Sequence, residues 1–161
     1  MSAVKVSFIV LAAIFGFAIL RGFEQDETQR ADAAAAIQSG DWAKYAKARL
    51  PGDSGSAELS DGHLTLKYHE PALTIGTFVT GFNLEVARLV PEIFAGAKDV
   101  DLVTIVDRGD FVDLRGHSSI GDAIRIEFAR QNASQVNWSN VLYDNIPKIA
   151  DDYWRHPGLD K

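Results

Sequence analysis

Hydrophobic and polar positions divide the chain into an apolar start and a longer part in which apolar residues recur at regular spacings. Residues 6–20 read VSFIVLAAIFGFAIL and carry no charge, with Lys5 before them and Arg21 after them. A bilayer-spanning helix usually needs about 20 apolar residues, but flanking basic side chains that reach the interface extend a short span. We therefore predict a membrane anchor or signal segment over residues 1–23.

A cleaved secretory signal is the alternative interpretation, because signal peptides have apolar cores of about 7–15 residues. After Leu20 no small-residue cleavage pattern occurs before Ala31 and Ala33, which favours an uncleaved anchor. The rest of the chain is then extracytoplasmic, and periplasmic if the host is bacterial; with cleavage it would be a secreted protein. Because the chain has no cysteine, neither disulfides nor a lipid on an N-terminal cysteine can hold it.

Residues 24–50 predict a helical stalk in two pieces. Residues 24–37 are rich in alanine and straight-chain polar residues, which are good helix formers. A second short helix begins after Asp41, a favourable N-cap. Trp42 and Tyr45 share one face of this second helix. We expect that face to dock onto the folded domain rather than to lie at a membrane interface.

The density of glycine, proline and serine in residues 51–56 indicates a linker, so we place the folded domain at residues 57–161. It begins with Asp61 and Gly62 between alternating residues, which is typical of a type I′ hairpin. The second strand of this hairpin should bury one face and leave the other polar. The expected inward residues are Leu64, Leu66 and Tyr68.

A helix follows the first hairpin. Residues 73–79 are expected to be extended, and residues 84–97, capped by Asn83, carry an apolar stripe at helical spacing. Proline removes a backbone donor and clashes with the preceding turn. Pro91 should therefore kink or split this helix.

The last third of the chain predicts strands and then a helix. Residues 101–107 and 111–114 should pair as a second hairpin around a turn at 108–110, because β-branched residues dominate the first of them. Strict alternation over 123–130 indicates another strand, and apolar spacing over 139–155 indicates a closing helix. The predicted fold class is α+β, with a small antiparallel sheet of four to five strands packed by two helices.

Charge and motifs exclude several functions. The formal net charge of −6 argues against nucleic acid as a partner, because phosphate binding needs clustered lysine and arginine. The metal-binding patterns HExxH, CxxC and the EF-hand loop are missing from the sequence, and we expect neither a metal site nor a cofactor. His63 and His69 share a strand face but lie about 20 Å apart at 3.3 Å per residue, too far to share a metal.

Two chemical alternatives stay open. A hydrolase or lyase could use His69, Glu70 or His117 in a cleft. Asp107, Asp110 and Asp113 could bind Ca²⁺ around the second hairpin, although the usual order of ligands is missing and aspartate is also a common turn former. Neither alternative has a complete motif, and we predict no catalytic residue.

Aromatic side chains near the C-terminus are the candidate partner contacts. Trp138, Tyr143, Tyr153 and Trp154 lie close together in the sequence, and tryptophan and tyrosine are enriched in binding hot spots. Trp154 belongs to the apolar face of the closing helix, so we expect it in the core. The predicted function is a membrane-anchored extracytoplasmic module that binds a protein partner in the cell envelope, with Trp138, Tyr143 and Tyr153 as contacts.

Overall fold

The first predicted hairpin is confirmed in the computed structural model, which describes residues 27–52, 54–70 and 74–160. Strands β1 (Ser56–Ser60) and β2 (His63–His69) pair antiparallel. Between them Asp61 and Gly62 have φ values of 50° and 79°, as a type I′ turn requires. The expected inward residues are all buried: Leu64, Leu66 and Tyr68.

The next element is the long helix α3 (Ile75–Gly96), which starts earlier than predicted. Thr74, not Asn83, is its N-cap, and the two hydroxyl side chains of Thr74 and Thr77 complete a capping box. The expected extended segment at 73–79 is therefore wrong from Ile75 onward. Pro91 lies within the helix without ending it, because buried residues before and after it pack on the same sheet and offset the lost hydrogen bond.

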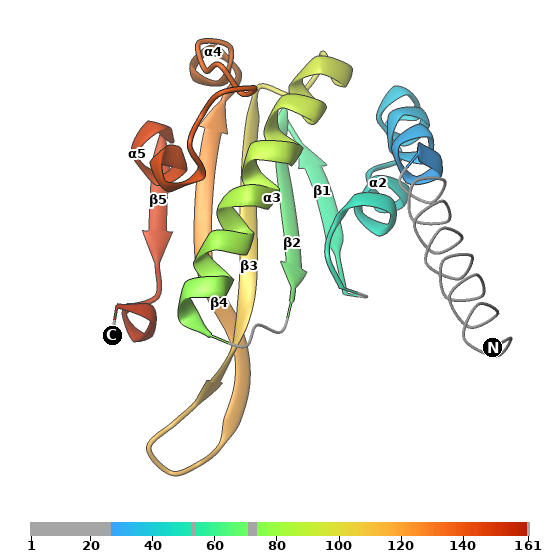
Figure 1. Ribbon diagram of the computed structural model, residues 1–161. Coiled ribbons are helices and arrows are strands. Elements are labelled where there is room, and N and C mark those ends of the chain that lie inside the picture. The colour runs from blue at the N-terminus through green and yellow to red at the C-terminus, as the bar shows by residue number, and fades with distance from the viewer. Residues whose placement is uncertain (1–26, 53, 71–73, 161) are drawn as a thin grey trace, which may run out of the picture.

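Strand β3 (Leu102–Val112) returns parallel to β2, since α3 carries the chain back across the sheet. β3 then pairs antiparallel with β4 (Ser118–Ala129). The expected turn at 108–110 is wrong, because β3 continues through it with a register shift between Asp107 and Arg108. The chain reverses at 113–117 instead, and the two strands project as a long ribbon (Figure 1).

The C-terminal region contains no long helix among the described residues, so the helix predicted over 139–155 is wrong. Pro147 sits in the first turn of a four-residue helix, where its missing N–H costs nothing, and the following residues pair with the free edge of β4. Short elements fill the region: α4 (Arg130–Ala133), η1 (Tyr143–Asn145), α5 (Ile146–Ile149), β5 (Asp152–Arg155) and η2 (Pro157–Leu159).

The five strands form one mixed sheet in the order β1-β2-β3-β4-β5, which confirms an α+β fold but corrects the expected all-antiparallel pairing. Helix α3 lies across one face of the sheet (Figure 1). Ile124, Ile126 and Phe128 of β4 point to this face and are fully buried, as predicted. The face that points away from α3 carries polar side chains, because the strands alternate.

Helix α2 (Trp42–Arg49) lies against β1, and the helix over residues 27–39 contacts the end of α3, where Ile37 meets Gly96. Asp41 caps α2 by accepting the Lys44 N–H at 2.9 Å. Trp42 and Tyr45 are buried, which confirms that they dock this helix. Within the described ranges no helix is long and apolar enough to cross a membrane, and the anchor predicted over residues 6–20 lies outside those ranges.

Replacement of Glu92 with alanine should lower the free energy of unfolding by about 2 kcal/mol, because it leaves a mostly buried arginine unpaired. Glu92 on α3 accepts from the Tyr45 hydroxyl at 3.0 Å and from Arg49 Nε at 2.9 Å. Urea denaturation measures the loss. The exposed Asp32, which pairs with Lys44 at 3.5 Å, is the control, and its alanine variant should change stability by less than about 0.5 kcal/mol. Equal effects of both variants would contradict the prediction.

Candidate functional site

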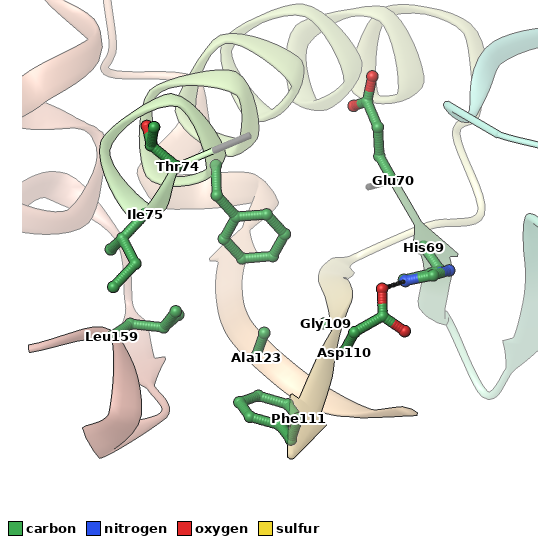
Figure 2. Close-up of a pocket in the computed structure, with 10 residues that line it drawn as sticks. His69, Glu70, Thr74, Ile75, Gly109, Asp110, Phe111, Ala123 and Leu159 are labelled. Atoms are coloured by element: carbon green, nitrogen blue, oxygen red, sulfur yellow. Dashed lines mark hydrogen bonds and ion pairs between the residues drawn. The ribbon is translucent and has the colours of Figure 1, made fainter. Parts of the chain in front are cut away.

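A pocket of about 170 Å³ opens where β2 ends and α3 begins. Figure 2 shows apolar side chains on one side of it and a histidine–aspartate pair on the other. Five segments line it: the end of β2, the start of α3, the distal half of β3, β4 and the C-terminal η2. The lining residues are His69, Glu70, Thr74, Ile75, Phe78, Gly109, Asp110, Phe111, Ala123 and Leu159.

The floor of the pocket is shaped by the irregularity in β3. Gly109 pairs with Gly121 across the ribbon, and the Phe111 ring packs over both of them, because a Cβ at either glycine would lie 3.5 to 3.6 Å from that ring. A Cβ on Gly109 would also lie 3.2 Å from the Ala123 Cβ. Bulges and glycine pairs re-aim strand side chains in this way, and here they bring Asp110 to the end of β2.

His69 and Asp110 form the polar side of the pocket, with His69 Nε2 and Asp110 Oδ2 3.1 Å apart. Glu70 points away from this pair in Figure 2. The hydroxyl at the rim belongs to Thr74, whose Oγ1 accepts the Thr77 N–H at 3.1 Å as part of the helix cap. The pocket thus holds an oriented imidazole, while its one hydroxyl is already used by the helix.

Asp107 lies buried behind this rim, with 2% of its surface exposed. Its carboxylate accepts the backbone N–H groups of Glu70 and Arg108, while Oδ1 itself has no hydrogen-bond partner among the described residues. Burial, with the nearby charge of Glu70 adding to it, raises the pKa of Asp107 to about 8. Its neighbour across the parallel pair is Tyr68, whose pKa burial also raises. Sequence reasoning missed this acid, because it placed Asp107 beside a turn.

The three aspartates proposed as a Ca²⁺ site are separated along β3 and the turn after it. Asp107 is buried, Asp110 binds His69, and Asp113 organises the turn by accepting the N–H groups of Arg115 and His117 at 2.8 Å each. Hydrogen bonds from the His117 backbone lower the pKa of Asp113. Across the described part of the chain no three histidine or acidic side chains come together as metal ligands.

The structure separates the three predicted partner contacts, and no ring contact joins any two of them in the described ranges. The Trp138 ring packs edge-on against Phe128 at 5.4 Å and donates its Nε1–H to the Ala133 carbonyl. Tyr153 is half-buried in β5 and Tyr143 is exposed on η1. Trp154, expected in the core, lies on the polar face of the sheet with 37% of its surface exposed.

A chain of hydrogen bonds crosses the polar face of the sheet. His63 Nε2 lies 2.7 Å from Thr104 Oγ1, and Thr104 donates to Glu127 Oε1 at 3.2 Å. The alternation of β2 predicted that His63 faces away from the core. Its partners could not be found from the sequence, because they depend on the strand order.

Comparison of the chain with protein-family models, with curated proteins and with solved structures finds no match. The function is therefore inferred from the residues of the pocket and the surfaces around it.

Proposed function

We propose that the protein is a membrane-anchored extracytoplasmic module that binds another protein, and that the pocket at the end of β2 receives one side chain of that partner. The extracytoplasmic location is inferred from the apolar stretch over residues 6–20 and the basic residues beside it. The binding function is inferred from the size and lining of the pocket.

The size and lining of the pocket carry this proposal. Small-molecule sites usually have volumes of about 300–1,000 Å³, whereas this pocket measures about 170 Å³. Its walls are apolar and its rim carries carboxylates, which suits the insertion of a single anchoring side chain. Interfaces are commonly held by a few such anchors in desolvated pockets.

A hydrolase or lyase is the second candidate, and the contact between His69 and Asp110 favours it. A carboxylate that orients an imidazole is one part of a nucleophilic site. The second part, an available nucleophile, is not provided by Thr74, because its hydroxyl serves the helix cap. The size and lining of the pocket therefore favour the binding of a partner side chain over catalysis.

A photo-crosslinking residue at Ile75 should capture a protein in membranes of cells that express the chain. Ile75 lies at the rim of the pocket and is partly exposed, so the probe would touch the inserted partner. The same probe at Lys67, which is exposed on the polar face of β2, is the control and should give several-fold less adduct. Mass spectrometry of the adduct identifies the captured protein.

The same preparation separates binding from catalysis. A His69→Asn variant should leave the crosslinked adduct in place, because the apolar walls are unchanged. If the protein were a hydrolase, this variant would lower turnover of its substrate about 10²–10⁴-fold. Absence of any adduct at Ile75, together with turnover that depends on His69, would contradict the proposed function.

A further inference from the structure

The distal half of the β3–β4 ribbon stands clear of the rest of the sheet (Figure 1). β2 ends where His69 pairs with Arg108, and β5 reaches only as far as Ile124 of β4. From Gly109 to Val112, β3 therefore has a free edge on the side of β2 within the described ranges. Free strand edges are surfaces on which another strand can pair.

The turn at the end of the ribbon is held in one shape. Asp113 accepts two backbone N–H groups of the turn, its own N–H donates to the His117 carbonyl at 3.0 Å, and its carboxylate lies 3.1 Å from His117 Nδ1. Gly116 supplies the positive φ of 84° that the reversal needs. A loop ordered in this way loses little conformational freedom when it binds.

This ordered turn presents an apolar side chain entirely to solvent. Leu114 has a relative exposure of 107%, and Val112 next to the turn is 67% exposed. Arg115 follows directly, so the tip of the ribbon, Leu114 and Arg115, combines an exposed apolar side chain with a positive charge. Such an arrangement suits insertion into a pocket with apolar walls and an acidic rim.

The pocket at the base of the same ribbon has this complementary character. Ile75, Phe78 and Phe111 supply apolar walls, and Glu70 and Asp110 supply carboxylates at the rim. The tip cannot reach its own pocket, because Gly109 and Phe111 belong both to the ribbon and to the pocket floor. A second copy of the chain carries a matching tip.

We propose that a second copy occupies the pocket: Leu114 of each protomer enters the pocket of the other, and Arg115 lies against Glu70 and Asp110. This specifies the partner in the binding function inferred above and rests on it. Antiparallel pairing of the free β3 edges of two chains, from Gly109 to Val112, would bring the tip of each ribbon to the end of β2 in the other chain. The contact is the same in both directions, so it closes as a two-fold dimer.

Disulfide trapping tests this geometry directly, because the natural chain contains no cysteine. The full chain with Leu114→Cys is mixed in mild detergent with the full chain with Ile75→Cys, under mild oxidation. A cross-linked heterodimer is expected, since a disulfide needs Cα atoms about 4.4–6.8 Å apart. Ser60→Cys, at the end of β1 and opposite the start of β2, is the control partner. Equal trapping with Ser60→Cys would overturn the proposal.

Charge reversal tests the pairing of tip and rim. Arg115→Glu and Glu70→Arg should each weaken the dimer about tenfold, and the two changes together should restore it. Sedimentation equilibrium of the full chain measures the dissociation constant. A wild-type chain that stays monomeric, or single variants that dimerise like the wild type, would overturn the proposal.

The outcome also distinguishes this inference from the binding function. If the probe at Ile75 captures a different protein while the chain remains monomeric, the binding function stands and the dimer is wrong. If the probe captures nothing and the chain remains monomeric, both are wrong.

Discussion

Replacing Arg130 with alanine is expected to lower the free energy of unfolding by about 3 kcal/mol, because one guanidinium serves several carbonyl groups at the end of α3. Arg130 Nη1 donates to the Phe94 carbonyl and Nε to the Val100 carbonyl, both at 2.9 Å. Nη2 also donates to the Ala97 carbonyl. Helix α3 has no basic residue in its own last turn, so α4 supplies the cation that the C-terminal end of the helix favours.

Lysine should recover less than half of this loss. Its ammonium group cannot reach carbonyls in several directions as the planar guanidinium does, and it would lose the stacking of Arg130 over the Phe94 ring at 4.8 Å. Urea denaturation of Arg130→Ala and Arg130→Lys measures both effects.

The control for Arg130 is Arg125→Ala on the polar face of β4. Arg125 pairs with Asp152 at 3.1 Å, and both side chains are nearly half exposed. An exposed pair of this kind is worth less than about 1 kcal/mol. An Arg130→Ala variant as stable as Arg125→Ala would show that α3 does not need this cap.

The free energy of unfolding should fall by about 3 kcal/mol between pH 5 and pH 8, because of Asp107 alone. Burial raises the pKa of Asp107 to about 8, well above the ordinary value of 3.8. Between these two values the folded protein binds one more proton than the unfolded chain does. Its stabilising contribution is therefore complete below pH 3.8 and is lost as the pH rises through 8.

An Asp107→Asn variant should remove this dependence, because asparagine carries no charge and its amide oxygen can take the place of the carboxylate oxygen that accepts the N–H groups of Glu70 and Arg108. We expect the variant to match the wild type near pH 5 and to be more stable at pH 9. Denaturation curves from pH 5 to pH 9 measure the difference. Among the groups around Asp107, the carboxylate of Glu70 adds to the shift, and the hydroxyl of Tyr68 stays protonated over this range.

Asp122→Asn is the matched control, because Asp122 is an exposed carboxylate on the adjacent strand β4. It should keep the pH dependence of the wild type. A wild-type stability that does not change between pH 5 and pH 8, or one that rises, would contradict a buried protonated Asp107.

The sequence correctly predicted those elements that are determined by residues close together in the chain. The turn at Asp61 and Gly62 needs positive φ at both positions, so the residues themselves define it. Asp41 caps α2 because its side chain reaches an N–H three residues away. The inward side of β4 followed from its strict alternation.

Elements that depend on distant partners were missed. Pro91 predicted a kinked or split helix, yet α3 stays one continuous helix because its packing along the sheet outweighs the cost of the proline. Apolar spacing over residues 139–155 indicated a helix, but the free edge of β4 offered backbone partners for β5. The turn at 108–110 satisfied local turn preferences, and pairing along β4 kept those residues in a strand instead.

The candidate site also combines residues that the sequence indicated with contacts that only the tertiary structure creates. From the sequence alone, His69 and Glu70 were candidates for chemistry, and Asp110 was considered only as a Ca²⁺ ligand. Their meeting depends on the parallel crossover through α3 and on the register shift in β3, because only these place the end of β2 beside Gly109 and Asp110. The apolar walls come from α3, β3 and η2, which no local pattern connects.

The sequence by itself determined the apolar first segment, the inward faces of β2 and β4, the first hairpin and the absence of cysteine. Periodicity and turn chemistry act over a few residues, so they can be read along the chain. The tertiary structure decided the strand order, the burial of Asp107, the pocket at the end of β2 and the exposure of Leu114. These features depend on free energies of packing between residues far apart in the chain, which no single segment specifies.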